Sequence, residues 1–134
     1  MLSDHPSVLA LLKEELVGWL TTINDASQPQ ASPVWHVTDG DDLIVYSRPN
    51  ARRLTNLQSH PKVSYNLRGD PQGDSIVTME GTARPDPNTP SPLGAPDYMS
   101  KYTEEMIRLG WSVEEYDQEF PIAIRITVTR IRAT

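Results

Sequence analysis

The sequence predicts a mainly β protein, a small barrel of six strands with few helices. Apolar and polar residues alternate strictly in IAIRITVTRI near the carboxyl end, and β-branched or aromatic residues fill short runs elsewhere. Asp39-Gly40 separates two such runs, which favours a tight hairpin because glycine accepts a positive φ. A barrel of this size is filled by its own side chains, so a ligand would lie on its outer wall or at an interface.

A helix is expected at the start of the chain and a second one near its middle. Pro6 is favoured in a first helical turn, and apolar residues recur at helical spacing from Val8 to Leu16. The second helix is expected over residues 51–59 and should end at His60, because Pro61 follows. Six runs predict strands, namely VGWLTTI, PQASPVWHVT, LIVYS, KVSYNLR, SIVTMEGTAR and IAIRITVTRI.

The proline-rich segment RPDPNTPSPLGAP cannot form a helix or a central strand, so we expect a surface loop over residues 85–96 that is mobile or well exposed. After the loop, Tyr98, Tyr102, Met106 and Leu109 would line one face of a helix that ends at Gly110. VEEYDQEF predicts a further short helix. Residues 1–134 are expected to form a single domain.

Composition limits the classes of function. The formal net charge of -6 argues against a nucleic-acid binder, because an acidic surface repels a polyanion, and it requires any anion site to be local. The absence of cysteine excludes disulfides and thiolate chemistry. No apolar run is long enough to cross a membrane and no signal peptide is evident, so we expect a cytoplasmic protein.

Motifs for metal binding or catalysis are missing. His5, His36 and His60 lack metal-ligand spacing, so no metal site is predicted. The glycine-rich fingerprints of nucleotide-binding proteins and hydrolases do not occur. No catalytic acid or base is predicted either, because His36 alternates with Trp35 and should point away from a ligand on the Trp35 face.

A candidate anion site lies in YSRPNARRLTNLQSHPKV, positions 46–63. Arg52 and Arg53 begin the predicted helix, where free backbone N–H groups and the helix dipole favour an anion and guanidinium groups add bidentate donors. Ser47 and Arg48 end the preceding strand and are expected to point toward the same corner. A solvated basic turn is the alternative, and spacing alone leaves the two interpretations about even.

Residues 17–68 resemble the split-barrel flavin-binding proteins related to pyridoxamine 5′-phosphate oxidase. The resemblance rests on GWLTT, QPQASPVWHVTDGDDLIVYS and RPNARRLTNLQSHPKVSYNL in that order, and MEGTAR with YMSKYTEEMIRLGW and FPIAIRITVTRIR extends it. It is closest to the short branch that binds the deazaflavin coenzyme F420, whose members carry similar PVW and KYTEEMIRLG segments. The chain lacks the carboxy-terminal substrate-phosphate arginines of true oxidases, which argues against oxidation of pyridoxamine phosphate.

The resemblance implies a cofactor site and a homodimer. In that family the cofactor phosphate lies against the basic residue of K/R-x-x-N-L, which corresponds to Arg53 here and is completed by Asn56 and Leu57. The ring system would lie along the strand that carries Pro33 to Trp35, and a partner subunit would close the site. The residues expected to bind the cofactor are Pro33, Val34, Trp35, Ser47, Arg48, Arg52, Arg53 and Asn56.

The function expected from this resemblance is that of an oxidoreductase in which reduced F420 gives a hydride to a small conjugated or unsaturated substrate. Two alternatives stay open: an FMN-binding flavoprotein reductase or oxidase, and a cofactor-binding module without turnover. F420 carries a polyglutamate tail beyond its phosphate. Four basic residues of the flanking turns are expected to meet that negative charge, namely Arg48, Arg52, Lys62 and Arg68.

Overall fold

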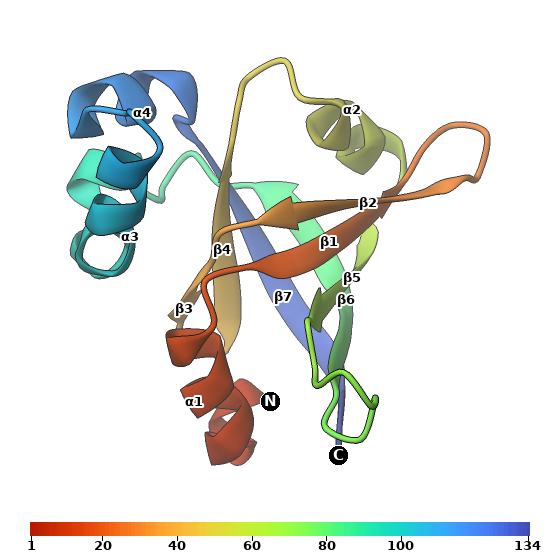
Figure 1. Cartoon of the computed structure of the whole chain (residues 1–134). Helices are drawn as coiled ribbons and strands as arrows, with labels where there is room; N and C mark the ends of the chain where they lie inside the picture. Colours follow the sequence, from red (N-terminus) through yellow and green to blue (C-terminus); the bar gives the residue numbers. More distant parts are fainter.

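The computed structural model describes residues 1–134 and is mainly β, with seven antiparallel strands in one sheet of order β2-β1-β5-β6-β7-β4-β3 (Figure 1). This confirms the predicted fold class. The expected number of strands is wrong by one, because PQASPVWHVT forms two strands that are separated by a bend at Trp35 and His36. The strands are β1 (Gly18–Ile23), β2 (Pro29–Val34), β3 (Val37–Asp39), β4 (Asp42–Ser47), β5 (Lys62–Leu67), β6 (Val77–Pro85) and β7 (Ile122–Ala133).

The two edge strands of the sheet, β2 and β3, are consecutive in the chain. Only Trp35 and His36 join them, so the sheet has to curl until its two edges are neighbours. No ladder of hydrogen bonds pairs β2 with β3, so the barrel is split along this line. Pro29 and Pro33 are tolerated in β2 because an edge strand does not need every backbone N–H.

Helices close the two ends of the barrel. α1 (Pro6–Glu14) and α2 (Arg52–Ser59) lie at opposite ends of the curved sheet (Figure 1). They contribute Leu12 and Leu57 to the apolar interior, together with inward side chains of the strands. Both helices were predicted, and Ala51 proves to be the N-cap residue of α2 rather than its first residue. No helix of the structure has the length and apolar character needed to cross a membrane.

A second apolar core lies outside the barrel, where α3 (Pro96–Arg108) and α4 (Val113–Glu119) pack beside β4 (Figure 1). β4 is therefore buried on both faces, with Leu43 toward the barrel interior and Tyr46 toward the helices. Tyr98, Tyr102 and Met106 are buried on the predicted face of α3. Leu109 differs from that prediction, because α3 ends at Arg108 and Leu109 is 53% exposed.

The loop expected over residues 85–96 is more structured than its prolines suggest. Most of its side chains are exposed, as predicted, but Asp86 and Pro92 are buried. β6 continues to Pro85, and Pro92–Gly94 forms a 3-10 helix. The Tyr46 hydroxyl donates a hydrogen bond to Pro90 O (2.7 Å), which ties the loop to β4.

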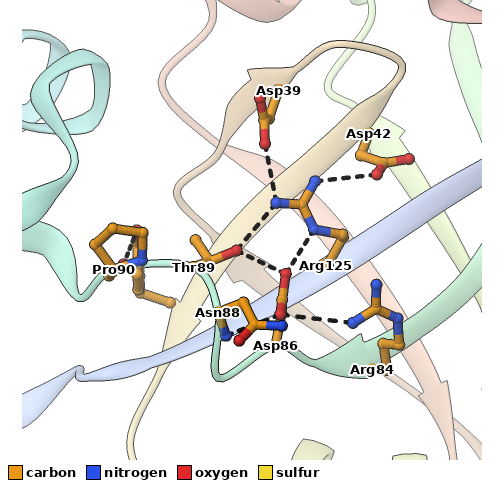
Figure 2. A network of polar contacts seen from close by, with 9 residues as sticks. Asp39, Asp42, Arg84, Asp86, Asn88, Thr89, Pro90 and Arg125 are labelled. Atoms are coloured by element: carbon orange, nitrogen blue, oxygen red, sulfur yellow. Dashed lines mark hydrogen bonds and ion pairs between the residues drawn. The ribbon is translucent and has the colours of Figure 1, made fainter.

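Arg125 of β7 anchors the start of this loop. Its guanidinium donates to the carboxylates of Asp86 (2.8 Å), Asp42 (3.0 Å) and Asp39 (2.9 Å), as Figure 2 shows. The hydrogen bonds from Arg125 and from Thr89 lower the pKa of Asp86 to about 2. Because Asp39 and Asp42 belong to β3 and β4, the cluster joins that hairpin to β7 and to the loop that follows β6.

Candidate functional site

Two neighbouring hollows lie along edge strand β2, and Arg53 lines both of them. The polar hollow has a volume of about 230 Å³, and its lining includes Gln30, Ser32, Arg52, Arg53 and Asn56. The apolar hollow has a volume of about 260 Å³, and its lining includes Pro33, Trp35, Tyr46, Trp111, Tyr116 and Phe120. The structure thus brings Arg53 together with Pro33, Val34 and Trp35, which the sequence analysis assigned to one site.

Arg53 lies in the first turn of α2 with its side chain half-buried. Its Nη2 donates to Ser32 Oγ (3.1 Å), and no ion pair of the structure involves Arg53 or Arg52. Burial lowers the pKa of Arg53, because desolvation of the cation is not offset by a nearby acid. A guanidinium has five donors, so most of those on Arg53 remain available for an anion.

Asn56 fixes the position of Arg53 from the next turn of the same helix. Its side chain is buried, and its amide nitrogen donates to Thr22 Oγ1 (2.9 Å) of β1 and to Gln30 Oε1 (3.0 Å) of β2. Residues three apart on a helix lie on the same face, so these bonds also hold Arg53 against β2. Both donors of Asn56 are used within the chain, which makes it a positioning residue.

Stacked aromatic rings form the wall of the apolar hollow. Trp35 lies between Tyr102 (ring centroids 4.6 Å apart, 6° between planes) and Tyr116 (5.4 Å, 16°). Trp111 meets Tyr116 and Phe120 edge-on, and the Phe120 and Tyr116 rings are tilted by 32° with centroids 4.5 Å apart. Burial raises the pKa of Tyr46 and of Tyr116 to about 12, so both stay uncharged at neutral pH. Arg53 is the only charged residue that lines this hollow.

Ser47 and Arg48 are not brought into either hollow. Ser47 is fully buried, and its Oγ donates to Arg48 O (3.0 Å). The Arg48 Nε lies 2.9 Å from Glu119 Oε1, and its guanidinium carbon lies 4.9 Å from the centre of the Phe120 ring. The Arg48 side chain is therefore directed to the end of α4 and lines neither hollow.

Lys62 and Arg68 stand at opposite ends of β5, which runs over Lys62–Leu67. Six residues of strand separate them by roughly 20 Å, so only Lys62 remains close to the end of α2. The sequence already contained this separation, because KVSYNLR was predicted to form a strand with Lys62 and Arg68 at its two ends.

His36 points into the barrel, as the alternation with Trp35 predicted. Its Nε2 donates to Leu12 O (2.9 Å), its Nδ1 accepts from the Tyr65 hydroxyl, and the side chain is fully buried. Burial, with the nearby Lys101 charge, lowers the pKa of His36 to about 4. His36 is therefore neutral at physiological pH and does not face either hollow.

Several lining residues were not predicted. Ser32 accepts a hydrogen bond from Arg53, 21 residues later in the chain, and Gln30 accepts one from Asn56, 26 residues later. No local sequence pattern reveals contacts at such separations. Trp111, Tyr116 and Phe120 come from α4 and its flanks, far from the segment that carries the arginines. The i to i+4 spacing of Tyr116 and Phe120 was a usable signal, because it puts two aromatic rings on one helical face.

Comparisons with known proteins identify relatives by family and fold. A family model described as pyridoxamine 5′-phosphate oxidase matches residues 5–134, whereas no curated protein gives a significant match. A putative pyridoxamine 5′-phosphate oxidase from Listeria innocua has a TM-score of 0.70 and 21% identity over 99% of this chain and 98% of its own. An F420 reductase has a TM-score of 0.66 and 21% identity, with coverages of 92% and 94%.

The same fold occurs in a protein with a different ligand. The heme storage protein HutZ from Vibrio cholerae has a TM-score of 0.66 and 18% identity, with coverages of 96% of this chain and 93% of its own. At these identities the likeness shows the fold, and the chemistry of the site has to be argued from the side chains that line it.

Proposed function

Because the chain belongs to the pyridoxamine 5′-phosphate oxidase family, we propose that it is an oxidoreductase that binds the deazaflavin coenzyme F420 along β2. The observation that supports this most strongly is Arg53, a half-buried cation without an acidic partner at the junction of a polar and an apolar hollow. The cofactor phosphate would bind Arg53 and Arg52, and the ring system would lie against Pro33, Val34 and Trp35.

The residues of the two hollows fit a phosphate that is joined to a flat apolar ring. Guanidinium groups match phosphate oxygens in geometry and charge, and aromatic walls exclude water from a ring. When bound, reduced F420 supplies a hydride, and the acceptor is a small conjugated or unsaturated molecule. The residues of the chain bind, orient and desolvate, because the apolar hollow presents no group that titrates near neutral pH.

The preference for F420 over FMN would come from the tail beyond the phosphate. Arg52 and Lys62 are exposed beside α2 and form no ion pair, so they are placed to meet carboxylates in an otherwise acidic protein. Exposed pairs of this kind contribute about 0.2–1 kcal/mol each, so the preference should be modest and should decrease with salt.

A second copy of this chain would complete the site. Each hollow, at about 230 and about 260 Å³, is smaller than the roughly 300–1,000 Å³ of an ordinary ligand pocket. The Cα of Trp19 pairs with that of Pro33, which lines the apolar hollow, and Trp19 is 44% exposed. A homodimer would cover Trp19 and enclose the ring from the other side.

FMN is the alternative cofactor, because it shares the phosphate and the tricyclic ring and would use the same hollows. A cofactor-binding module without turnover is the other alternative, and it is favoured by the absence of an acid or base among the residues that line the apolar hollow.

The identity of the natural cofactor is tested by purifying the protein from a host that makes F420 and identifying the bound small molecule by mass spectrometry. We expect F420. Recovery of FMN under the same conditions would favour the flavoprotein alternative. A protein that binds F420 but catalyses no reduction of any conjugated acceptor would support the module without turnover.

A further inference from the structure

Arg48 connects the turn before α2 with the aromatic wall of the apolar hollow. Its backbone oxygen accepts from Ser47 Oγ (3.0 Å) and from the Ala51 N–H (3.2 Å), so its main chain helps to fix the turn that leads into Arg52 and Arg53. Its side chain leaves in another direction, toward Glu119 (2.9 Å) and the ring of Phe120 (4.9 Å).

Phe120 is the outer member of the aromatic wall. It packs on Tyr116 at 4.5 Å and on Trp111 at 5.7 Å, and all three residues line the apolar hollow. Phe120 directly follows Glu119, the last residue of α4, and Arg48–Glu119 is the only ion pair that joins α4 to another element. α4 is also held by the Leu93 N–H, which donates to Asp117 Oδ1 (2.9 Å), and by the hydrogen bond between the Tyr98 and Tyr116 hydroxyls (2.8 Å), and Arg48 adds the contact that lies nearest to Phe120.

We propose that Arg48 is a positioning residue that holds Phe120 and the end of α4 as the wall of the ring site, and that it does not bind the phosphate or the tail of the cofactor. This proposal rests on the proposed function, because it assumes that the ring system of the cofactor binds in the apolar hollow. Arginine suits this task better than lysine, because its planar group can stack on Phe120 while its edge donates to Glu119.

Four variants test the proposal by titration with F420 and with FMN: Arg48→Gln, Arg48→Lys, Glu119→Gln and the double variant Arg48→Gln with Glu119→Gln. We expect Glu119→Gln, which loses only an exposed ion pair, to weaken binding by about two- to five-fold, and Arg48→Gln, which also loses the cation–π contact, to weaken it somewhat more. The double variant should bind no more weakly than Arg48→Gln alone, because both changes release the same wall. Arg48→Lys should lie between the native protein and Arg48→Gln.

The sign of the Glu119→Gln effect separates the two roles of Arg48. If Arg48 bound the anionic part of the cofactor, removal of Glu119 would free the guanidinium and tighten binding, and Arg48→Gln would reduce the salt dependence of affinity. Tighter binding by Glu119→Gln would overturn the proposal. We expect weaker binding together with an unchanged salt dependence for Arg48→Gln.

Glu114→Gln is the matched control, because Glu114 is an exposed acid of the same helix without an ion pair. It should leave both affinity and spectrum unchanged. Near-ultraviolet circular dichroism of the cofactor-free protein reports the packing of Trp111, Tyr116 and Phe120 directly. We expect the same spectral change for Arg48→Gln and Glu119→Gln. Native spectra for both variants would overturn the proposal, and this test does not require a bound cofactor. A native protein that binds neither cofactor would instead contradict the proposed function.

Discussion

Arg53 is the residue on which the proposed cofactor site depends most. It lines both hollows, and Ser32 is the only hydrogen-bond partner of its guanidinium within the chain. Arg53→Ala should weaken cofactor binding by roughly ten- to a hundred-fold, because a charge-assisted hydrogen bond contributes about 1.5–3 kcal/mol. Fluorescence titration at one salt concentration measures this change.

The control for Arg53→Ala is Arg132→Ala, which removes an exposed arginine of β7 that forms no ion pair and lines neither hollow. Both variants should unfold at nearly the native midpoint, because neither cation has an acidic partner to lose. An Arg53→Ala protein with native affinity for both cofactors would remove Arg53 from the site.

His36 makes the stability of the protein depend on pH. Its pKa is about 4 in the folded state, below the ordinary value of 6.5, so the unfolded chain binds a proton more readily between these two values. The stabilisation is complete above pH 6.5 and is lost as the pH falls toward 4. The expected loss in the free energy of unfolding is roughly 3 kcal/mol.

Urea unfolding at several pH values compares the native protein with His36→Gln, whose amide can donate to Leu12 O and accept from Tyr65 but does not titrate. We expect the variant to lose less stability than the native protein between pH 6.5 and 4. Equal pH dependence of the two proteins would show that His36 does not cause the effect.

At the scale of the elements, the Arg125 cluster explains why the proline-rich segment is ordered at its start. The composition of residues 85–96 predicted exposure, and most of the segment is exposed. It could not reveal that Asp86 meets an arginine 39 positions away on β7. A salt bridge between distant segments depends on the register of the strands, which the sequence pattern does not contain.

Replacement of Arg125 should loosen the β3–β4 hairpin and the loop together. Arg125→Met leaves the carboxylates of Asp39 and Asp42 without a cation and leaves Asp86 with only its longer pair to Arg84 (3.7 Å), which lowers the thermal midpoint by several degrees. Arg130→Met is the control, since Arg130 is exposed on the same strand and forms no ion pair. We also expect faster proteolysis within residues 86–91, and native midpoints with native protease resistance would contradict this role.

The bend at Trp35 and His36 is the one strand boundary that the sequence analysis missed. Residues 29–38 read as one run, because alternation continues through the bend. The bend is held by α3, where the Tyr102 hydroxyl accepts the His36 N–H (2.9 Å) across 66 positions. By contrast, β7, the Asp39-Gly40 hairpin and the positive-φ Gly110 just after the end of α3 depend on neighbouring residues and were predicted correctly.

At the scale of the whole molecule, the sequence predicted the mainly β class and the family, and it grouped Arg53 with Pro33, Val34 and Trp35, which line one hollow in the structure. It placed Arg53 at the start of a helix and Pro33 and Val34 on a strand, both of which are local properties, whereas Trp35 lies in the bend that follows. It did not predict the direction of the Arg48 side chain or the second aromatic wall, because Glu119, Phe120 and Trp111 approach only in the folded chain.

The protein should form a homodimer. Light scattering after size exclusion should give twice the 15.0 kDa of one chain. Trp19→Glu should shift the equilibrium toward the monomer, because it places a charge on the exposed apolar surface beside Pro33. A native protein that is monomeric at micromolar concentration would contradict the proposed second half of the site.

The most direct test of the proposed function is a side-by-side fluorescence titration of the native protein with F420 and with FMN, repeated at low and high salt. Both ligands have a phosphate and a tricyclic ring, so we expect the preference to come mainly from the carboxylates of the F420 tail and the exposed cations near α2. We expect tighter binding of F420, by a margin that shrinks as the salt concentration rises. Equal affinity at all salt concentrations, or bound FMN that F420 fails to displace, would contradict the proposal.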